Sequence, residues 1–92
     1  MIRVLVVDDS KTLRQLISAV LESDPELQVV GLASNGEEAI SLCGRLQPDV
    51  ITMDIRMPAM NGLEAIQHIM AESPRPIVVC TTTVSDKELN IT

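Results

Sequence analysis

Aromatic side chains are absent from this sequence: none of its 92 residues is Phe, Tyr or Trp. Any hydrophobic core must therefore consist of Leu, Ile, Val and Ala, with five Met available to fill gaps. A chain of this length forms at most one small domain, which buries a smaller share of its surface than a large one. Because apolar residues still make up 46% of the chain, the composition argues against disorder.

Positive charge is also scarce. Seven Lys and Arg stand against thirteen Asp and Glu, so the net charge is −6. Such a balance does not suit binding to a phosphate backbone, and no aromatic ring is available to stack on bases. We therefore expect no nucleic-acid contact by this domain.

Long hydrophobic runs and paired cysteines are missing as well. The N-terminal apolar run is too short for a signal peptide and ends in two acids, and no segment could span a bilayer. We expect a cytoplasmic protein without membrane insertion. Cys43 and Cys80 lie far apart in the sequence, without metal-binding or redox spacing, which predicts two reduced and mostly buried thiols.

What the sequence does contain is a regular alternation of aliphatic strands and amphipathic helices. The predicted strands are Ile2–Val7, Leu27–Ala33, Asp49–Met53 and Ile77–Cys80. Near-continuous aliphatic strands separated by helices are typical of a parallel sheet covered on both faces. The predicted fold class is α/β, a flavodoxin-like doubly wound parallel sheet.

Each of the three segments between these strands carries apolar residues at helical spacing. In the first segment, Leu13, Leu16, Ile17, Val20 and Leu21 predict an amphipathic helix. In the other two, the positions expected to face inward are Ala39, Ile40, Cys43 and Leu46, then Leu63, Ile66 and Met70. Ser34 and Glu37 form an S-x-x-E capping box that would begin the second helix. A second box at Ser85 and Glu88 predicts a fourth helix, and we expect the domain, residues 1–92, to be truncated within it.

Three acids follow the ends of predicted strands. Asp8 and Asp9 come directly after the first strand, and Asp54 ends the third. In the flavodoxin-like strand order these two strands are neighbours at the switch point, so the three carboxylates should meet there, with Thr81 facing the same crevice. A few oxygen ligands suit Mg²⁺ rather than zinc. Mg²⁺ beside a free carboxylate and a hydroxyl group is an arrangement for phosphoryl transfer.

The segments VLVVDDS, PDVITMDIRMPAMNGLEAI and PIVVCTT resemble the receiver domain of two-component response regulators. This resemblance implies that Asp54 accepts a phosphoryl group from a histidine kinase and also binds Mg²⁺. It implies that Asp9 and the backbone carbonyl of Arg56 bind the ion directly, and that Asp8 does so largely through water. Thr81 would be the switch hydroxyl.

Within this family, PDVITMDIRMPAMNGLEAIQHIM and SPRPIVVCTT most resemble the receiver of chemotaxis protein-glutamate methylesterases. In those proteins the receiver precedes a C-terminal esterase domain and restrains it until phosphorylation. The resemblance thus implies an output domain, whereas the receiver itself would catalyse only its own phosphorylation and dephosphorylation. Receivers of this family have an essential Lys at the end of a fifth strand. That Lys, the fifth strand and the helix after it are missing here. The predicted strand order is therefore 2-1-3-4 with an open edge at the fourth strand, so dimerisation or a swapped assembly is expected.

Other functions share parts of this pattern. Free-standing receivers and receivers of transcription regulators have the same core motifs, so both stay open. A phosphatase that uses an aspartyl-phosphate normally has D-x-D spacing and a downstream Lys, which do not appear here. A nucleotide-binding module would need a glycine-rich loop, and the sequence has none. The only histidine, His68, is expected on the surface of the third helix rather than as a phosphate carrier.

Overall fold

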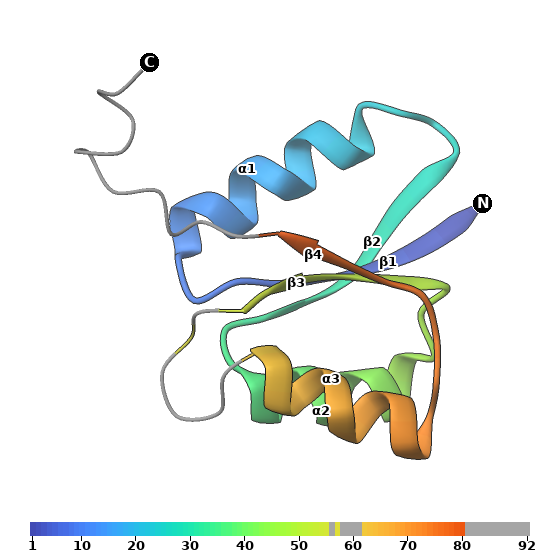
Figure 1. Cartoon of the computed structure of the whole chain (residues 1–92). Helices are drawn as coiled ribbons and strands as arrows, with labels where there is room; N and C mark the ends of the chain where they lie inside the picture. The colour runs from blue at the N-terminus through green and yellow to red at the C-terminus, as the bar shows by residue number, and fades with distance from the viewer. Residues whose placement is uncertain (56, 58–61, 81–92) are drawn as a thin grey trace.

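The computed structural model describes residues 1–55, 57 and 62–80. Strands and helices alternate along them in the order β1 (Ile2–Val7), α1 (Lys11–Glu22), β2 (Leu27–Ala33), α2 (Gly36–Leu46), β3 (Val50–Asp54), α3 (Gly62–Glu72) and β4 (Ile77–Cys80). The four strands form one parallel sheet in the order β2-β1-β3-β4 (Figure 1). The predicted fold class and strand order are confirmed. The predicted fourth helix lies outside the described residues.

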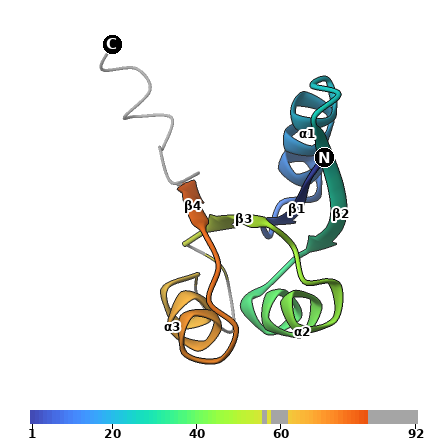
Figure 2. The same cartoon turned by 90° about the vertical axis from the view of Figure 1, so that its right-hand side faces the viewer.

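The helices lie on both faces of the sheet, α1 on one and α2 with α3 on the other (Figure 2). The main core lies between the sheet and the α2–α3 layer, where every residue is aliphatic or carries sulfur. Its fully or almost fully buried members include Leu5, Val7, Ala39, Cys43, Ile51, Met53, Ala65 and Ile69. Val4 and Val6 of β1 are buried as well, so this strand is buried on both faces as its unbroken aliphatic run predicts.

Helix α1 covers the sheet along a narrower stripe than the sequence predicts. Ser10 caps its N-terminus by accepting a hydrogen bond from the Leu13 N–H at 3.2 Å. Leu13, Ile17 and Leu21 are half-buried, whereas Leu16 and Val20 are 57% and 62% exposed, so only part of the apolar face of this amphipathic helix is covered. The helix packs over β1 and β2, and this contact covers only the i, i+4, i+8 stripe.

Helix α2 begins one residue later than the predicted capping box. Its N-cap is Asn35, whose side chain accepts from the Glu38 N–H at 2.8 Å. The Glu38 carboxylate in turn accepts from the N–H and hydroxyl of Ser34. The predicted pairing of Ser34 with Glu37 is therefore wrong, because Glu38 is the acid at the third helical position.

Helix α3 also turns a different face to the core. Leu63 and Met70 are 58% and 49% exposed, whereas Gly62, Ala65 and Ile69 are buried, so the prediction holds only for the half-buried Ile66. The reason is the tight approach at Gly62, whose N–H donates to the Ile55 carbonyl at 3.1 Å. This contact favours a rotation of the helix in which Gly62, Ala65 and Ile69 face the sheet.

Strand β3 begins at Val50 rather than Asp49 and includes Asp54. The Asp49 N–H donates to the Arg3 carbonyl, and the Arg3 N–H donates to the Asp49 carboxylate, both at 2.8 Å. A side-chain acceptor thus takes the Arg3 N–H at this end of β1, and the pairing of β1 with β3 starts at Val4 and Val50.

The remaining predictions on single residues agree with the structure where it describes them. Cys43 is buried, Cys80 is partly buried, and both are free thiols. His68 is exposed on α3. Within the described part of the chain, no helix is both long and apolar enough to cross a membrane.

Candidate functional site

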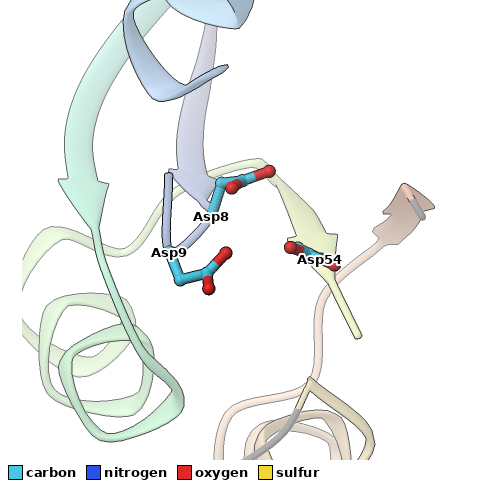
Figure 3. A group of neighbouring side chains, drawn as sticks. All are labelled: Asp8, Asp9 and Asp54. Carbon is cyan, nitrogen blue, oxygen red and sulfur yellow. The ribbon is translucent and has the colours of Figure 1, made fainter. Parts of the chain in front are cut away.

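Three carboxylates meet at the C-terminal edge of the sheet. Val7 of β1 lies opposite Met53 of β3, so the next residue of each strand, Asp8 and Asp54, reaches the same level. Asp9 follows in the turn to α1, and the three side chains point toward one another (Figure 3). One carboxylate oxygen from each of them lies within 4.8 Å of the other two. The predicted convergence of these acids is therefore present.

Asp8 is the most constrained of the three acids. Its side chain is 1% exposed, its N–H donates to the Ala33 carbonyl at 3.0 Å, and its Oδ1 accepts from the Ser10 N–H at 2.8 Å. Oδ2 is buried without a hydrogen-bond partner. Burial raises the pKa of the Asp8 carboxyl; the Ser10 N–H opposes this rise, and the nearby charges of Asp54 and Asp9 add to it. A bound cation would offset the cost of burying this carboxylate oxygen without a donor.

The other two acids differ in their access to water. Asp54 is 1% exposed at the end of β3, whereas Asp9 is exposed. The cluster is thus buried on the side of the sheet and open on the side of Asp9. This donor set, three carboxylates of which Asp8 has an unpartnered buried oxygen, fits a hard divalent cation such as Mg²⁺.

Two predicted site residues, Arg56 and Thr81, lie outside the described part of the chain. Cys80, the residue before Thr81, pairs with Asp54 in the β3–β4 register. Burial raises the pKa of the Cys80 thiol, and the charges of Asp8 and Asp54 raise it further. The end of β4 at Cys80 is therefore beside the acidic cluster, and the role of Thr81 stays a prediction.

Sequence reasoning missed the contacts of two residues that shape the site. The Arg14 guanidinium donates to the Asp8 carbonyl at 2.7 Å, a contact that no motif in the sequence indicates. Gly62 matches the loop that follows the acceptor in the receiver family, but its close packing was not predicted. A Cβ at that position would lie against the Asp54 carbonyl oxygen and 2.5 Å from the Ile55 Cα. A glycine after a loop that follows a candidate site residue was the available signal for close backbone approach.

The family model for the response regulator receiver domain matches residues 4–92. The chain belongs to the response regulator receiver family. The match spans nearly the whole sequence and includes all three acids, so the resemblance carried by the motifs is confirmed.

Relatives of this receiver domain include protein-glutamate methylesterases/protein-glutamine glutaminases. The one from Halalkalibacterium halodurans is 48% identical over 92% of this chain and 25% of its own length. The one from Agrobacterium fabrum is 55% identical over 87% of this chain and 23% of its own length. The receiver domain therefore spans about a quarter of these relatives.

A solved structure with the same fold is the response regulator domain of Thermotoga maritima CheB. It is 41% identical to this receiver domain, with a TM-score of 0.88, and the match covers 99% of this chain and 69% of that one. Sequence and structure thus agree on a receiver similar to those of CheB-type methylesterases, as the longer motifs predict.

Proposed function

We propose that this receiver domain accepts a phosphoryl group on Asp54 in a Mg²⁺-dependent transfer from a histidine kinase, within a chemotaxis system. The observation that carries the proposal is the cluster of Asp8, Asp9 and Asp54, with carboxylate oxygens within 4.8 Å of one another. Like charges brought together in a buried site are costly unless a counterion is present, so the arrangement is understandable if a cation and a phosphoryl group bind there.

Each residue of the cluster has its own part in this proposal. Asp9, the exposed acid, would hold Mg²⁺ directly together with the backbone carbonyl of Arg56, and Asp54 would be a further ligand. Asp8 would hold the ion largely through water, for which the unpartnered Oδ2 offers an acceptor. When bound, Mg²⁺ neutralises negative charge on the phosphoryl oxygens and so lowers the barrier to attack by an anion.

The transfer forms one bond and breaks one. A carboxylate oxygen of Asp54 attacks the phosphorus, the P–N bond of the phosphohistidine breaks, and the imidazole leaves with the electron pair. The product is an acyl phosphate. The Thr81 hydroxyl then donates a hydrogen bond to a phosphoryl oxygen and thereby couples phosphorylation to a conformational change. The burial of Asp54 excludes competing solvent from the attacking side.

The proposed output follows from the relatives. Protein-glutamate methylesterases are about four times as long as this chain, so we propose that the receiver controls a C-terminal esterase of that kind in the cytoplasm. The kinase and this output domain are the proposed partners.

The deciding experiment is incubation with Mg²⁺ and a small acyl phosphate donor, followed by intact mass spectrometry. We expect one phosphoryl adduct on the wild type and none on Asp54→Ala. Asp24→Ala is the matched control, because Asp24 is an exposed acid before β2, at the opposite edge of the sheet, and should leave the adduct unchanged. Chelation of Mg²⁺ should abolish the adduct.

Two results would contradict the proposal. One is a full adduct on Asp54→Ala, which would place the phosphoryl group elsewhere. The other is steady release of phosphate from varied esters without an adduct, which would indicate a phosphatase instead.

A further inference from the structure

The side chain of Arg14 connects helix α1 to the turn that carries the acids. Arg14 lies one turn into the helix, and its Nη1 donates to the Asp8 carbonyl oxygen at 2.7 Å. The residue is only partly exposed. A hydrogen bond from a charged donor is about twice as strong as one between neutral groups, so this contact restrains the turn more than an ordinary backbone bond would.

This bond acts on the peptide group between Asp8 and Asp9. The Asp8 N–H is held by the Ala33 carbonyl and its Oδ1 by the Ser10 N–H, which fixes the residue on the side of β1. Its carbonyl belongs to the peptide plane that leads into Asp9. The orientation of that plane sets the direction in which the exposed Asp9 side chain projects from the turn.

The guanidinium donates here to a neutral carbonyl and not to a carboxylate of the cluster. Asp8 Oδ2 accordingly stays without a hydrogen-bond partner. The charge of Arg14 also lowers the pKa of the Glu38 carboxyl at the start of α2, after the larger effect of the hydrogen bonds from Ser34.

We infer that Arg14 is a positioning residue for the cation site: through the Asp8 carbonyl, it holds the Asp8–Asp9 peptide in the orientation that binds Mg²⁺. This inference rests on the proposed function, since it concerns the same acids. It assigns no contact between Arg14 and the ion.

Positioning and simple electrostatics predict opposite results when Arg14 is replaced. Removing a positive charge close to three acids should by itself make cation binding tighter. Loss of the bond to the Asp8 carbonyl should make it weaker, because partners that orient metal ligands typically contribute about tenfold or more to affinity. The direction of the change therefore separates the two effects.

The test is a titration of the full chain with Mg²⁺ alone, in which the ¹H–¹⁵N NMR signals of the Ser10 and Asp9 amides report binding. NMR is suitable because the chain has no Tyr or Trp to report binding by fluorescence. We expect Arg14→Gln to raise the Kd for Mg²⁺ about tenfold. Lys11→Gln removes the same charge from the first turn of the same helix, and its Kd should stay equal to that of the wild type or fall.

A second control separates positioning from general loss of stability. The Ser18 hydroxyl donates to the Arg14 carbonyl at 2.7 Å, so Ser18→Ala removes a hydrogen bond of α1 without touching the acidic turn. We expect an unchanged Kd for this variant. An equal rise in Kd for Ser18→Ala and Arg14→Gln would overturn the inference, as would a Kd for Arg14→Gln at or below that of the wild type.

Should Arg14→Gln fail to fold, Arg14→Lys decides, because it keeps the charge but not the planar guanidinium. Weaker Mg²⁺ binding than in the wild type supports the inference, and equal binding overturns it. A wild type without any Mg²⁺-dependent shift would instead overturn the proposed function, and this inference with it. The two failures are thus distinguishable.

Discussion

At the scale of single residues, Asp8 is the least favourable group in the site. Its side chain is 1% exposed, one oxygen has no partner, and two further acids lie beside it. Because the pKa of Asp8 is raised in the folded protein, folding favours the protonated acid. Burial of the Asp8 carboxylate therefore costs no stability below the ordinary pKa of 3.8, where the acid is protonated in both states. The cost grows as the pH rises from 3.8 to the raised folded-state value and stays constant above it.

From this we predict that Asp8→Asn stabilises the metal-free chain at neutral pH. The free energy of unfolding should rise by about 1 kcal/mol, since a buried charge with an unsatisfied oxygen is removed while the bond from the Ser10 N–H can persist. The gain should shrink as the pH falls toward 3.8. Urea unfolding followed by far-UV circular dichroism in the presence of a chelator measures it. A variant less stable than the wild type at neutral pH would refute the prediction.

Gly62 gives a second prediction at this scale. A Cβ there would press on the backbone of Asp54 and Ile55, so Gly62→Ala should lower the free energy of unfolding by about 1–3 kcal/mol. Gly44→Ala is the matched control. Gly44 lies in α2, where an added methyl group would have no other atom within 4 Å, so that variant should gain about 0.5–1 kcal/mol. Both effects are measured by urea unfolding. Equal changes in the free energy of unfolding would show that an added methyl group at Gly62 does not clash with the backbone of Asp54 and Ile55, against the prediction.

At the scale of elements, the N-terminus of α2 carries two adjacent acids, Glu37 and Glu38, and only Glu38 bonds to the residue before the N-cap. Glu38 accepts from the hydroxyl and N–H of Ser34, which lowers the pKa of its carboxyl below the ordinary 4.5. A lowered pKa means that the ionised acid stabilises the fold above 4.5 and that this contribution is lost as the pH falls through the folded-state value.

We therefore predict a small loss of stability for Glu38→Gln at neutral pH, below about 1 kcal/mol because the carboxylate is exposed and screened by solvent. The loss should vanish in acid. Glu37→Gln removes the neighbouring charge from the same helical turn and should change stability less. Thermal unfolding of both variants at neutral and acidic pH tests this. A larger loss of stability for Glu37→Gln would contradict it and would support the pairing of Ser34 with Glu37 that the sequence predicts.

At the scale of the whole molecule, β4 lies at one side of the sheet and is incompletely covered. Among the described strands it pairs with β3 alone. Val78 and Val79 are 54% and 51% exposed, and an apolar groove beside the strand is lined by Ile66 and Met70 of α3. An apolar edge strand is a template for pairing with another chain.

We accordingly predict that the 92-residue chain associates with itself in a concentration-dependent way. Sedimentation velocity should show dimers or larger species, and Val79→Lys should shift them toward monomer because a charge on an edge strand opposes pairing. Leu63→Lys is the control, since Leu63 is 58% exposed on helix α3 and takes no part in strand pairing. A monomer whose β4 amides are as protected from hydrogen exchange as those of β1 would contradict the prediction.

The order of elements and the place of the acids follow from local patterns. Four aliphatic runs separated by helical periodicity predict the parallel sheet, and carboxyl ends of parallel strands meet at one edge, so Asp8 and Asp54 could be placed there without coordinates. The predicted faces of α1 and α3 were less accurate. Apolar periodicity shows which residues are able to face a core, whereas the exposure of Leu16 and Met70 depends on which face each helix turns toward the sheet.

Burial and long-range hydrogen bonds were decided only by the tertiary structure. The letters DD do not distinguish the buried Asp8 from the exposed Asp9; the difference arises because Asp8 continues the line of β1 beside β3, while Asp9 already belongs to the turn. The bond from Arg14 to the Asp8 carbonyl likewise requires α1 to fold back over the strand end. Residue types determined which chemistry is available at this edge of the sheet. The packing of strands and helices around it determined which carboxylate loses its water, because desolvation depends on neighbours that are distant in the sequence.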